Sequence, residues 1–251
     1  MTGRHSFKDH FSATAAAYAA YRPIYPTALA DFLAEIAPRS HLAWDAGCGS
    51  GQLSVLLADR FARVMATDAS AEQIAHATPR PHVAYVVARA EACALAVGTV
   101  DVAVAAQAAH WFDLPAYYAE VRRVGRPGGV VALVTYGLVR VDHVVDPVID
   151  HFYSQVLGSY WPPERRHVDD GYRALPFPFE EIGAPGLEMR ASWTRADLVG
   201  YVETWSAVWA LERAVGSGPL EAFRRELAHA WGADAAPRPV RWTLSLRVGR
   251  V

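Results

Sequence analysis

Cysteine is scarce in this chain of 251 residues, which contains only Cys48 and Cys93. Two cysteines cannot build a disulfide framework or a zinc cluster, so we expect no metal and a reducing compartment, the cytoplasm. The polar N-terminus lacks the apolar core of a secretory signal. No apolar run is long enough to cross a bilayer, so we expect no membrane partner.

An excess of charge of one sign is also missing, since 24 Lys and Arg stand against 26 Asp and Glu. A protein that grips a nucleic-acid backbone needs a basic excess, so we expect no nucleic-acid partner. Apolar residues, in contrast, form 52% of the chain, slightly above the usual share. Length and composition together predict one domain with a sizeable core, as a monomer or a homodimer.

The first half of the chain alternates short apolar strands with helices. Strands are expected at 41–46, 62–67, 83–87, 100–105 and 130–135, and helices at 12–21, 26–37, 52–60 and 115–124, with a turn at 127–129. Ser70 is a candidate N-cap for one further helix. This rhythm predicts a mostly parallel sheet with helices on both faces.

The second half differs, because residues 138–185 are rich in proline, aromatic and charged residues and indicate an insertion over one end of the sheet. Beyond it we expect strands at 189–194 and 240–248 and helices at 195–211 and 220–231. The last strand alternates apolar with polar residues, which favours an antiparallel strand near the sheet edge. The chain is therefore divided into 1–40 (N-terminal lid helices), 41–136 (cofactor-binding core), 138–185 (small helical, substrate-side insertion) and 186–251 (C-terminal strands and helices).

The strongest motif is Asp45-Ala46-Gly47-Cys48-Gly49-Ser50-Gly51, between a strand and a helix. Glycines there allow a tight turn and let a ligand approach the main chain. Its alternatives are a plain turn and a dinucleotide site, but the dinucleotide fingerprint has its third glycine one residue later. Asp68, after the second strand, can accept both hydroxyls of a cofactor ribose, whether or not that cofactor is a dinucleotide. Alternatively, it can serve only as an acid at a helix N-terminus.

The D-x-G-x-G-x-G form resembles motif I of class I methyltransferases. The segments 18–26 (YAAYRPIYP), 107–113 (QAAHWFD), 158–161 (GSYW) and 201–206 (YVETWS) resemble the trans-aconitate methyltransferase-like branch. The resemblance implies a Rossmann-like, seven-stranded sheet with an antiparallel C-terminal strand and S-adenosylmethionine as cofactor. Residues 87–91 resemble that family's adenine-side segment, although Arg89 stands where an acid is usual.

The cofactor is expected to contact residues from the N-terminal segment and from the loops after four strands. They are Tyr18, Arg22, Asp45, Gly47, Gly49, Gly51, Asp68, Ala69, Ala90, Glu91 and Gln107. The N-terminal segment is expected to fold over the methionine end of the cofactor, with Arg22 near its carboxylate.

Methyl transfer from a sulfonium needs an acceptor held in line with the leaving sulfur, in a dry, aromatic site. Candidate catalytic residues are His110 and Trp111, and His110 can be a base, a donor to substrate or a ring stacked near adenine. Candidate substrate-binding residues are Tyr25, Tyr136, Tyr160, Trp161, Arg165, Arg166 and Trp205. For the aromatic residues the alternative is ordinary packing, and for the arginines a solvated surface.

Arginines at 165 and 166 suit an acidic acceptor, because guanidinium pairs with carboxylate through two hydrogen bonds. The favoured function is therefore methylation of a small molecule, at a carboxylate oxygen. The alternatives are N- or O-methylation of a heteroaromatic or other secondary metabolite with His110 as base, and a non-catalytic scaffold that binds the cofactor.

Overall fold

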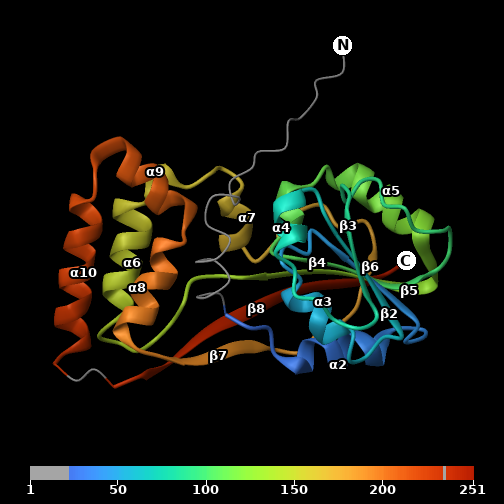
Figure 1. The fold of residues 1–251 in the computed structure, drawn as a ribbon, viewed down its shortest axis with the longest axis horizontal. Helices are drawn as coiled ribbons and strands as arrows, with labels where there is room; N and C mark the ends of the chain where they lie inside the picture. The colour runs from blue at the N-terminus through green and yellow to red at the C-terminus, as the bar shows by residue number, and fades with distance from the viewer. Residues whose placement is uncertain (1–22, 234–235) are drawn as a thin grey trace, which may run out of the picture.

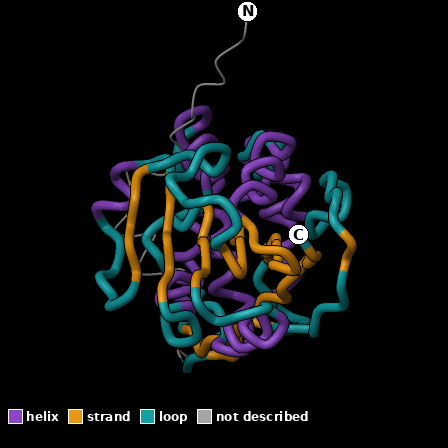
Figure 2. Tube along the Cα trace, turned by 90° about the vertical axis from the view of Figure 1, so that its right-hand side faces the viewer, coloured by secondary structure: helices purple, strands orange, loops and turns teal. Residues whose placement is uncertain are grey.

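The computed structural model describes residues 23–233 and 236–251. In this part of the chain eight strands form one sheet, in the order β3-β2-β1-β4-β5-β8-β6, with β7 also paired to β8. Figure 2 shows the strands side by side in one layer. The strands are β1 (Leu42–Ala46), β2 (Arg63–Asp68), β3 (Val83–Val87), β4 (Val100–Ala106), β5 (Gly125–Tyr136), β6 (Glu180–Glu181), β7 (Glu188–Trp193) and β8 (Arg238–Arg250).

Helices cover the sheet above and below in Figure 1, and a further group of helices stands beside it. The helical elements are α2 (Thr27–Ile36), α3 (Gln52–Leu57), α4 (Ala71–Ala75), η2 (Ala109–Trp111), α5 (Leu114–Val124), α6 (Asp146–His151), η3 (Phe152–Val156), η4 (Gly158–Tyr160), α7 (Arg165–Asp169), α8 (Arg195–Glu203), α9 (Ser206–Val215) and α10 (Gly218–Trp231). The predicted helix at 12–21 lies outside the described residues.

The five strands β1 to β5 are parallel, which confirms the predicted Rossmann-like architecture. Side chains alternate across β4, so that Val102 and Val104 pack against α2 and α3 and Ala103 and Ala105 pack toward α5. Both faces of the central strands are therefore apolar, as a doubly covered parallel sheet requires.

The C-terminal strand β8 is antiparallel to β5, as predicted, but it is not the edge of the sheet. Its other side pairs with β6 near Gly249 and with β7 over Arg238–Thr243. This outer neighbour is one interrupted strand, which explains why eight strands are present where seven were predicted. β6 also shows that the predicted insertion at 138–185 contributes to the sheet.

Two further predictions are wrong in detail. Residues 127–129 do not form a turn before the strand but lie inside β5, where a shift of register against β4 absorbs them. The single helix predicted at 195–211 is two helices, α8 and α9. Thr204 ends α8 by donating its hydroxyl to the Tyr201 carbonyl, and the Trp209 indole donates to the Glu203 carbonyl. These bonds satisfy carbonyls that a helix end leaves unpaired.

The insertion and the C-terminal helices form one helical lobe, made of α6, α8, α9 and α10, to the left of the sheet in Figure 1. Phe152 and Phe223 stack there with their ring centroids 4.3 Å apart, which joins the segment after α6 to α10. The helix α7 lies between this lobe and the sheet. Over residues 23–233 and 236–251, no helix has the length and apolar character that a membrane span requires.

Candidate active site

The glycine motif forms the turn between β1 and α3, at the carboxyl edge of the parallel strands. Gly47 and Gly51 have positive φ angles of 69° and 87°. A Cβ at Gly47 would come within 2.5 Å of the Ala108 Cβ, and one at Gly51 would collide with the Tyr85 hydroxyl. Two of the three glycines are thus required by the protein's own packing.

Gly49 differs from these two glycines. Its φ is 55°, and an added Cβ would meet only the Gln73 side chain, at 3.7 Å. Its backbone N–H donates to a carboxylate oxygen of Asp68, 2.8 Å away. The middle of the motif is therefore an open backbone cradle in which a ligand can reach the main chain.

Asp45, the carboxylate that opens the motif, is buried with 1% exposure. One oxygen, Oδ2, accepts a 2.6 Å bond from the Ser54 hydroxyl, whereas Oδ1 has no partner within the described structure. Burial, opposed by the bond from Ser54 and assisted by the negative charge of Asp68, raises the pKa of Asp45 to about 7. An orphaned buried carboxylate oxygen indicates a site for a cationic ligand group.

Asp68 ends β2 and joins the glycine turn to α4. Its second oxygen accepts from the Ser70 backbone N–H at 2.8 Å, and Ser70 in turn caps α4 as predicted. Ala69, between them, is half-buried. Asp68 is thus held rigidly at the carboxyl edge, next to Gly49.

The segment after β3 reaches the same edge. Ala90 is 6% exposed. Glu91 does not point freely into a pocket, because its two oxygens accept from the Asp113 backbone N–H and from Arg89. Through these hydrogen bonds Glu91 links the loop after β3 to the loop after β4.

Gln107 follows β4 in a left-handed conformation, with φ of 55°. Its Nε2 donates to the Tyr136 carbonyl, and its Oε1 accepts from the Thr135 hydroxyl at 2.7 Å. These contacts turn Gln107 toward the end of β5, so that a polar chain runs along the carboxyl edge of the sheet.

His110 is half-buried in η2, and its ring centroid lies 4.8 Å from that of Trp111. Its Nδ1 lies 2.7 Å from the Tyr172 hydroxyl. Removal from water lowers the pKa of His110 to about 3, and the charges of Arg165 and His167 act in the same direction. The imidazole is therefore neutral at neutral pH and a weak proton acceptor.

An aromatic cluster surrounds the guanidinium of Arg165. That group lies over the Trp161 and Tyr153 rings, 4.9 and 5.4 Å from their centroids. Its Nε donates to the Tyr153 hydroxyl at 2.7 Å and toward Asp169 at 3.3 Å. Trp205, which is 8% exposed, completes the cluster against Trp161. We call Tyr153, Trp161, Arg165 and Trp205 the Arg165 cluster.

The remaining predicted acceptor residues are not gathered around Arg165. Arg166, its neighbour, is exposed. Tyr25 and Tyr136 are buried and contact each other edge to face, with ring centroids 6.2 Å apart. Tyr160 is half-buried against the apolar core. Tyr18 and Arg22 lie outside the described residues.

Two residues of the site were missed by sequence reasoning, Tyr153 and Tyr172. Tyr153 lies eight residues before Trp161, and no motif marks it. Tyr172 contacts His110 across 62 positions of sequence. The helix α7, which carries Arg165, packs against η2, so the predicted histidine and arginine lie on neighbouring elements.

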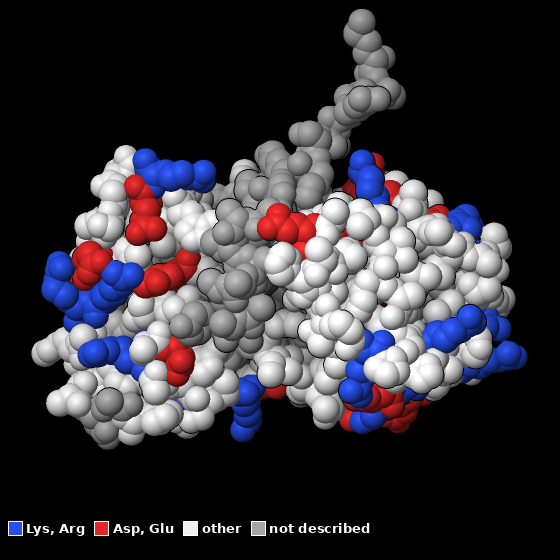
Figure 3. Space-filling model, in the orientation of Figure 1, with Lys and Arg blue, Asp and Glu red and all other residues white. Residues whose placement is uncertain are grey.

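Surface charge does not form a single field on the face shown in Figure 3, where acidic and basic side chains are interspersed. Among residues 23–233 and 236–251, no group of three or more His, Cys, Asp or Glu side chains is arranged to hold a metal ion.

The parallel sheet, its antiparallel final strand and the glycine cradle at the carboxyl edge define a class I methyltransferase fold. A family model described as a methyltransferase domain matches residues 44–133. A Dictyostelium discoideum protein assigned to the methyltransferases is 32% identical over 229 residues, which cover 90% of this chain and 87% of the relative. The chain therefore belongs to the S-adenosylmethionine-dependent methyltransferases and is an enzyme.

Two further comparisons bear on the fold and the substrate. The structure of a protein from Anaeromyxobacter dehalogenans, described as a type II methyltransferase, is 51% identical, with a TM-score of 0.87 over 92% of this chain and 98% of that chain. A malonyl-[acyl-carrier protein] O-methyltransferase of Dechloromonas aromatica is 36% identical over 146 residues, 56% of this chain and 53% of the relative.

The residues at the carboxyl edge fit S-adenosylmethionine, the cofactor of this family. The cradle at Gly49 leaves room beside the main chain that a Cβ would fill. The orphaned Oδ1 of Asp45 suits a ligand that carries an ammonium group. Asp68 supplies a carboxylate at the end of β2, where ribose hydroxyls can be bound.

Proposed function

We propose that this methyltransferase transfers the methyl group to a carboxylate oxygen of a small acid. The supporting observation is the Arg165 cluster, a guanidinium held among aromatic rings beside His110. Such a cation, removed from bulk water but not fully paired, is the group expected to bind an acceptor carboxylate. The proposal agrees with the resemblance to the trans-aconitate methyltransferase-like branch.

The cofactor would be held by three parts of the carboxyl edge. Gly49 would admit it to the main chain, Asp68 would accept from its ribose hydroxyls, and Asp45 would face its ammonium group. When bound, S-adenosylmethionine supplies an electrophilic methyl group on a sulfonium. Ala90, in the loop after β3, would lie beside the adenine.

Arg165 can bind an acceptor because its contacts use only part of its donor set. Its hydrogen bonds to Tyr153 and Asp169 are both made by Nε, and within the described residues its two terminal amino groups have no hydrogen-bonding partner. Those groups can donate to a carboxylate and hold it in place. The rings of Tyr153 and Trp161, which lie against the guanidinium, shield it in part from water and so strengthen the pairing.

A carboxylate acceptor needs no base, because it is already ionised at neutral pH. Attack of one oxygen on the methyl carbon forms a C–O bond and breaks the C–S bond, so that a methyl ester leaves with no proton transferred. The low pKa of His110 agrees with this scheme, since a base with a pKa of about 3 would remove a proton from an amine or phenol poorly. The O-methyltransferase relative acts, by its name, on a malonyl group, whose free end is a carboxylate.

The proposal is tested by two neighbouring arginines that differ in environment. Arg165→Gln should raise KM for an acidic acceptor at least tenfold, because a charge-assisted hydrogen bond contributes roughly 1.5–3 kcal/mol. Arg166→Gln is the matched control, since Arg166 is exposed on the same helix, and it should leave KM within about twofold. Equal effects of the two substitutions, or none from Arg165→Gln, would contradict the proposal.

A further inference from the structure

The side chain of Gln73 is a buried polar group without a partner in the protein. Gln73 lies in α4 and is 7% exposed. Its backbone N–H donates to the Ser70 hydroxyl, but within residues 23–233 and 236–251 its side-chain amide has no hydrogen-bonding partner. Removing an amide from water without such a partner costs free energy. A buried amide of this kind therefore indicates a ligand that satisfies it.

The amide of Gln73 is directed at the glycine cradle. A Cβ added at Gly49 would lie 3.7 Å from Oε1 of Gln73, and no other atom of the described residues lies within 4 Å of that position. The Asp68 carboxylate reaches the same glycine, because it accepts from the Gly49 backbone N–H at 2.8 Å. An amide and a carboxylate therefore flank the open backbone of Gly49.

The helix α4 that carries Gln73 is fixed beside the cradle at both of its ends. At its start, Asp68 accepts from the backbone N–H groups of Gly49 and Ser70, and Ser70 caps the helix. Just beyond its end, the Thr78 backbone N–H donates to the Ser50 carbonyl at 3.1 Å. The amide is therefore presented to the cradle by an anchored element.

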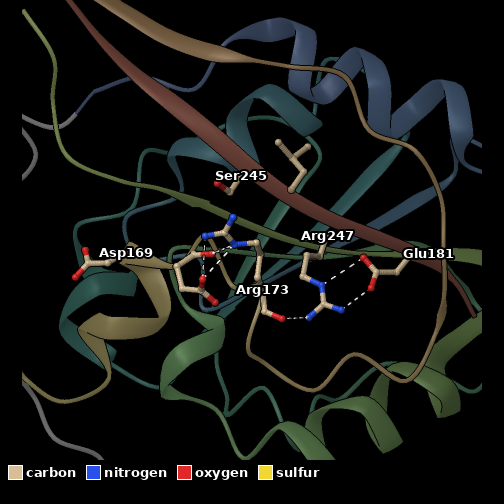
Figure 4. Close-up of a pocket in the computed structure, with 8 residues that line it drawn as sticks. Asp169, Arg173, Glu181, Ser245 and Arg247 are labelled. Atoms are coloured by element: carbon tan, nitrogen blue, oxygen red, sulfur yellow. Dashed lines mark hydrogen bonds and ion pairs between the residues drawn. The ribbon is translucent and has the colours of Figure 1, made fainter.

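The cavity beside β8 that Figure 4 shows differs from the cradle, because the two arginines that line it are already paired. It has a volume of about 570 Å³. Arg173 pairs there with Asp170, and Arg247 pairs with Glu181. A ligand that used these arginines would have to compete with their ion pairs, whereas a ligand in the cradle satisfies an amide that is already free.

We infer that the side-chain amide of Gln73 binds the ribose of S-adenosylmethionine together with Asp68. A ribose hydroxyl that donates its proton to the Asp68 carboxylate still has an oxygen that can accept. Nε2 of Gln73 can donate to that oxygen, since no protein group fixes which end of the amide faces the cradle. This inference rests on the placement of the ribose at Asp68 in the proposed function, and it does not depend on the methyl acceptor.

The test replaces Gln73 by methionine, which has a similar length but no amide. Calorimetry measures the binding of S-adenosylhomocysteine, the demethylated cofactor, and of its 2′-deoxy and 3′-deoxy analogues. Gln73→Met should bind S-adenosylhomocysteine about fivefold more weakly than the wild type, as the loss of one hydrogen bond allows. It should weaken at least one of the two analogues less than twofold. Equal weakening of all three ligands, or no weakening, would overturn the inference.

Two further variants separate hydrogen bonding from packing. Gln73→Glu keeps the shape but replaces the donor by a negative charge near Asp68, so it should weaken binding more than Gln73→Met does; a smaller effect would contradict the donor role. Gln155→Met is the matched control, because Gln155 is an exposed glutamine in η3, and it should leave all three affinities unchanged.

Thermal unfolding of the cofactor-free protein shows whether the lost affinity is a folding defect. The Tm of Gln73→Met should equal or exceed that of the wild type, because the amide has no bond within the protein to lose. A Tm lowered by several degrees would contradict the unpartnered state of the amide and with it the inference.

Asp68→Asn separates the inference from its premise. This variant should bind S-adenosylhomocysteine at least tenfold more weakly, because hydrogen bonds to a charged group are lost, and should lose most of the preference over the deoxy analogues. A retained preference would refute the ribose placement and the inference with it. The expected response of Asp68→Asn, combined with wild-type affinities in Gln73→Met, would refute the inference alone. Neither result affects the Arg165 test of the acceptor.

Discussion

Replacing Asp45 by asparagine should stabilise the cofactor-free protein while it weakens the binding of cofactor. Asp45 is buried, and its pKa of about 7 lies roughly three units above the ordinary value of 3.8. At about 1.36 kcal/mol per unit, ionising this group in the folded protein costs on the order of 4 kcal/mol as an upper limit. Asparagine has nearly the same shape and carries no charge to desolvate.

The sign of the pH dependence follows from linkage. Because the folded protein binds this proton more tightly than the unfolded chain does, the Asp45 contribution to the free energy of unfolding falls as pH rises from about 4 to 7. Asp45→Asn should therefore gain little stability near pH 4 and the most above pH 7. Urea denaturation of the cofactor-free protein at several pH values measures this difference.

The same substitution should lower the affinity for S-adenosylmethionine more than tenfold, because a charge-assisted bond to the ammonium group is lost. Asp101→Asn is a useful contrast. Asp101 is equally buried, but it is paired with Arg126 and accepts from two backbone N–H groups, so its substitution should destabilise the protein. The reasoning would be refuted if Asp45→Asn destabilised the protein at pH 8 and left cofactor affinity unchanged, as measured by calorimetry.

Two other predictions concern the cradle and the histidine. Gly49→Val should abolish cofactor binding in a folded protein, because the valine side chain would fill the cradle. Gly98→Val is the control, since it imposes a comparable left-handed strain in open space, and this variant should bind the cofactor normally. Equal binding by both variants would contradict the assignment of the cradle. His110→Asn should keep activity on an acidic acceptor within about tenfold, and the wild-type profile of kcat should stay flat between about pH 5 and 8, because the pKa of about 3 lies below that range. A hundredfold loss that follows an ionisation near neutrality would assign His110 as a base.

Local patterns were sufficient to predict the cofactor half of the chain. The strand at Val83–Val87 and the cap at Ser70 agree with the structure because period, propensity and capping act over a few residues. The glycine motif was recognisable for the same reason. The break between α8 and α9 was missed, since it depends on the Trp209 indole and the Thr204 hydroxyl rather than on proline or glycine.

The candidate acceptor residues were harder to predict from the sequence, because tertiary packing decides which of them lie together. The sequence could not distinguish Arg165 from Arg166, but in α7 Arg165 is half-buried against aromatic rings, whereas Arg166 is exposed. Glu91 matched a cofactor-side segment, yet it serves to join two loops. Tyr172 joins His110 from a distant segment through an unusual backbone conformation that no sequence period indicates.

The central claim is that a carboxylate oxygen receives the methyl group. The most direct test incubates the enzyme with S-adenosylmethionine labelled in the methyl group and a panel of small acids, amines and phenols, and then treats the product with mild base. The account predicts that the label enters an acid and that base releases it as methanol, as an ester requires. Label retained in a base-stable N-methyl or aryl ether product would contradict it.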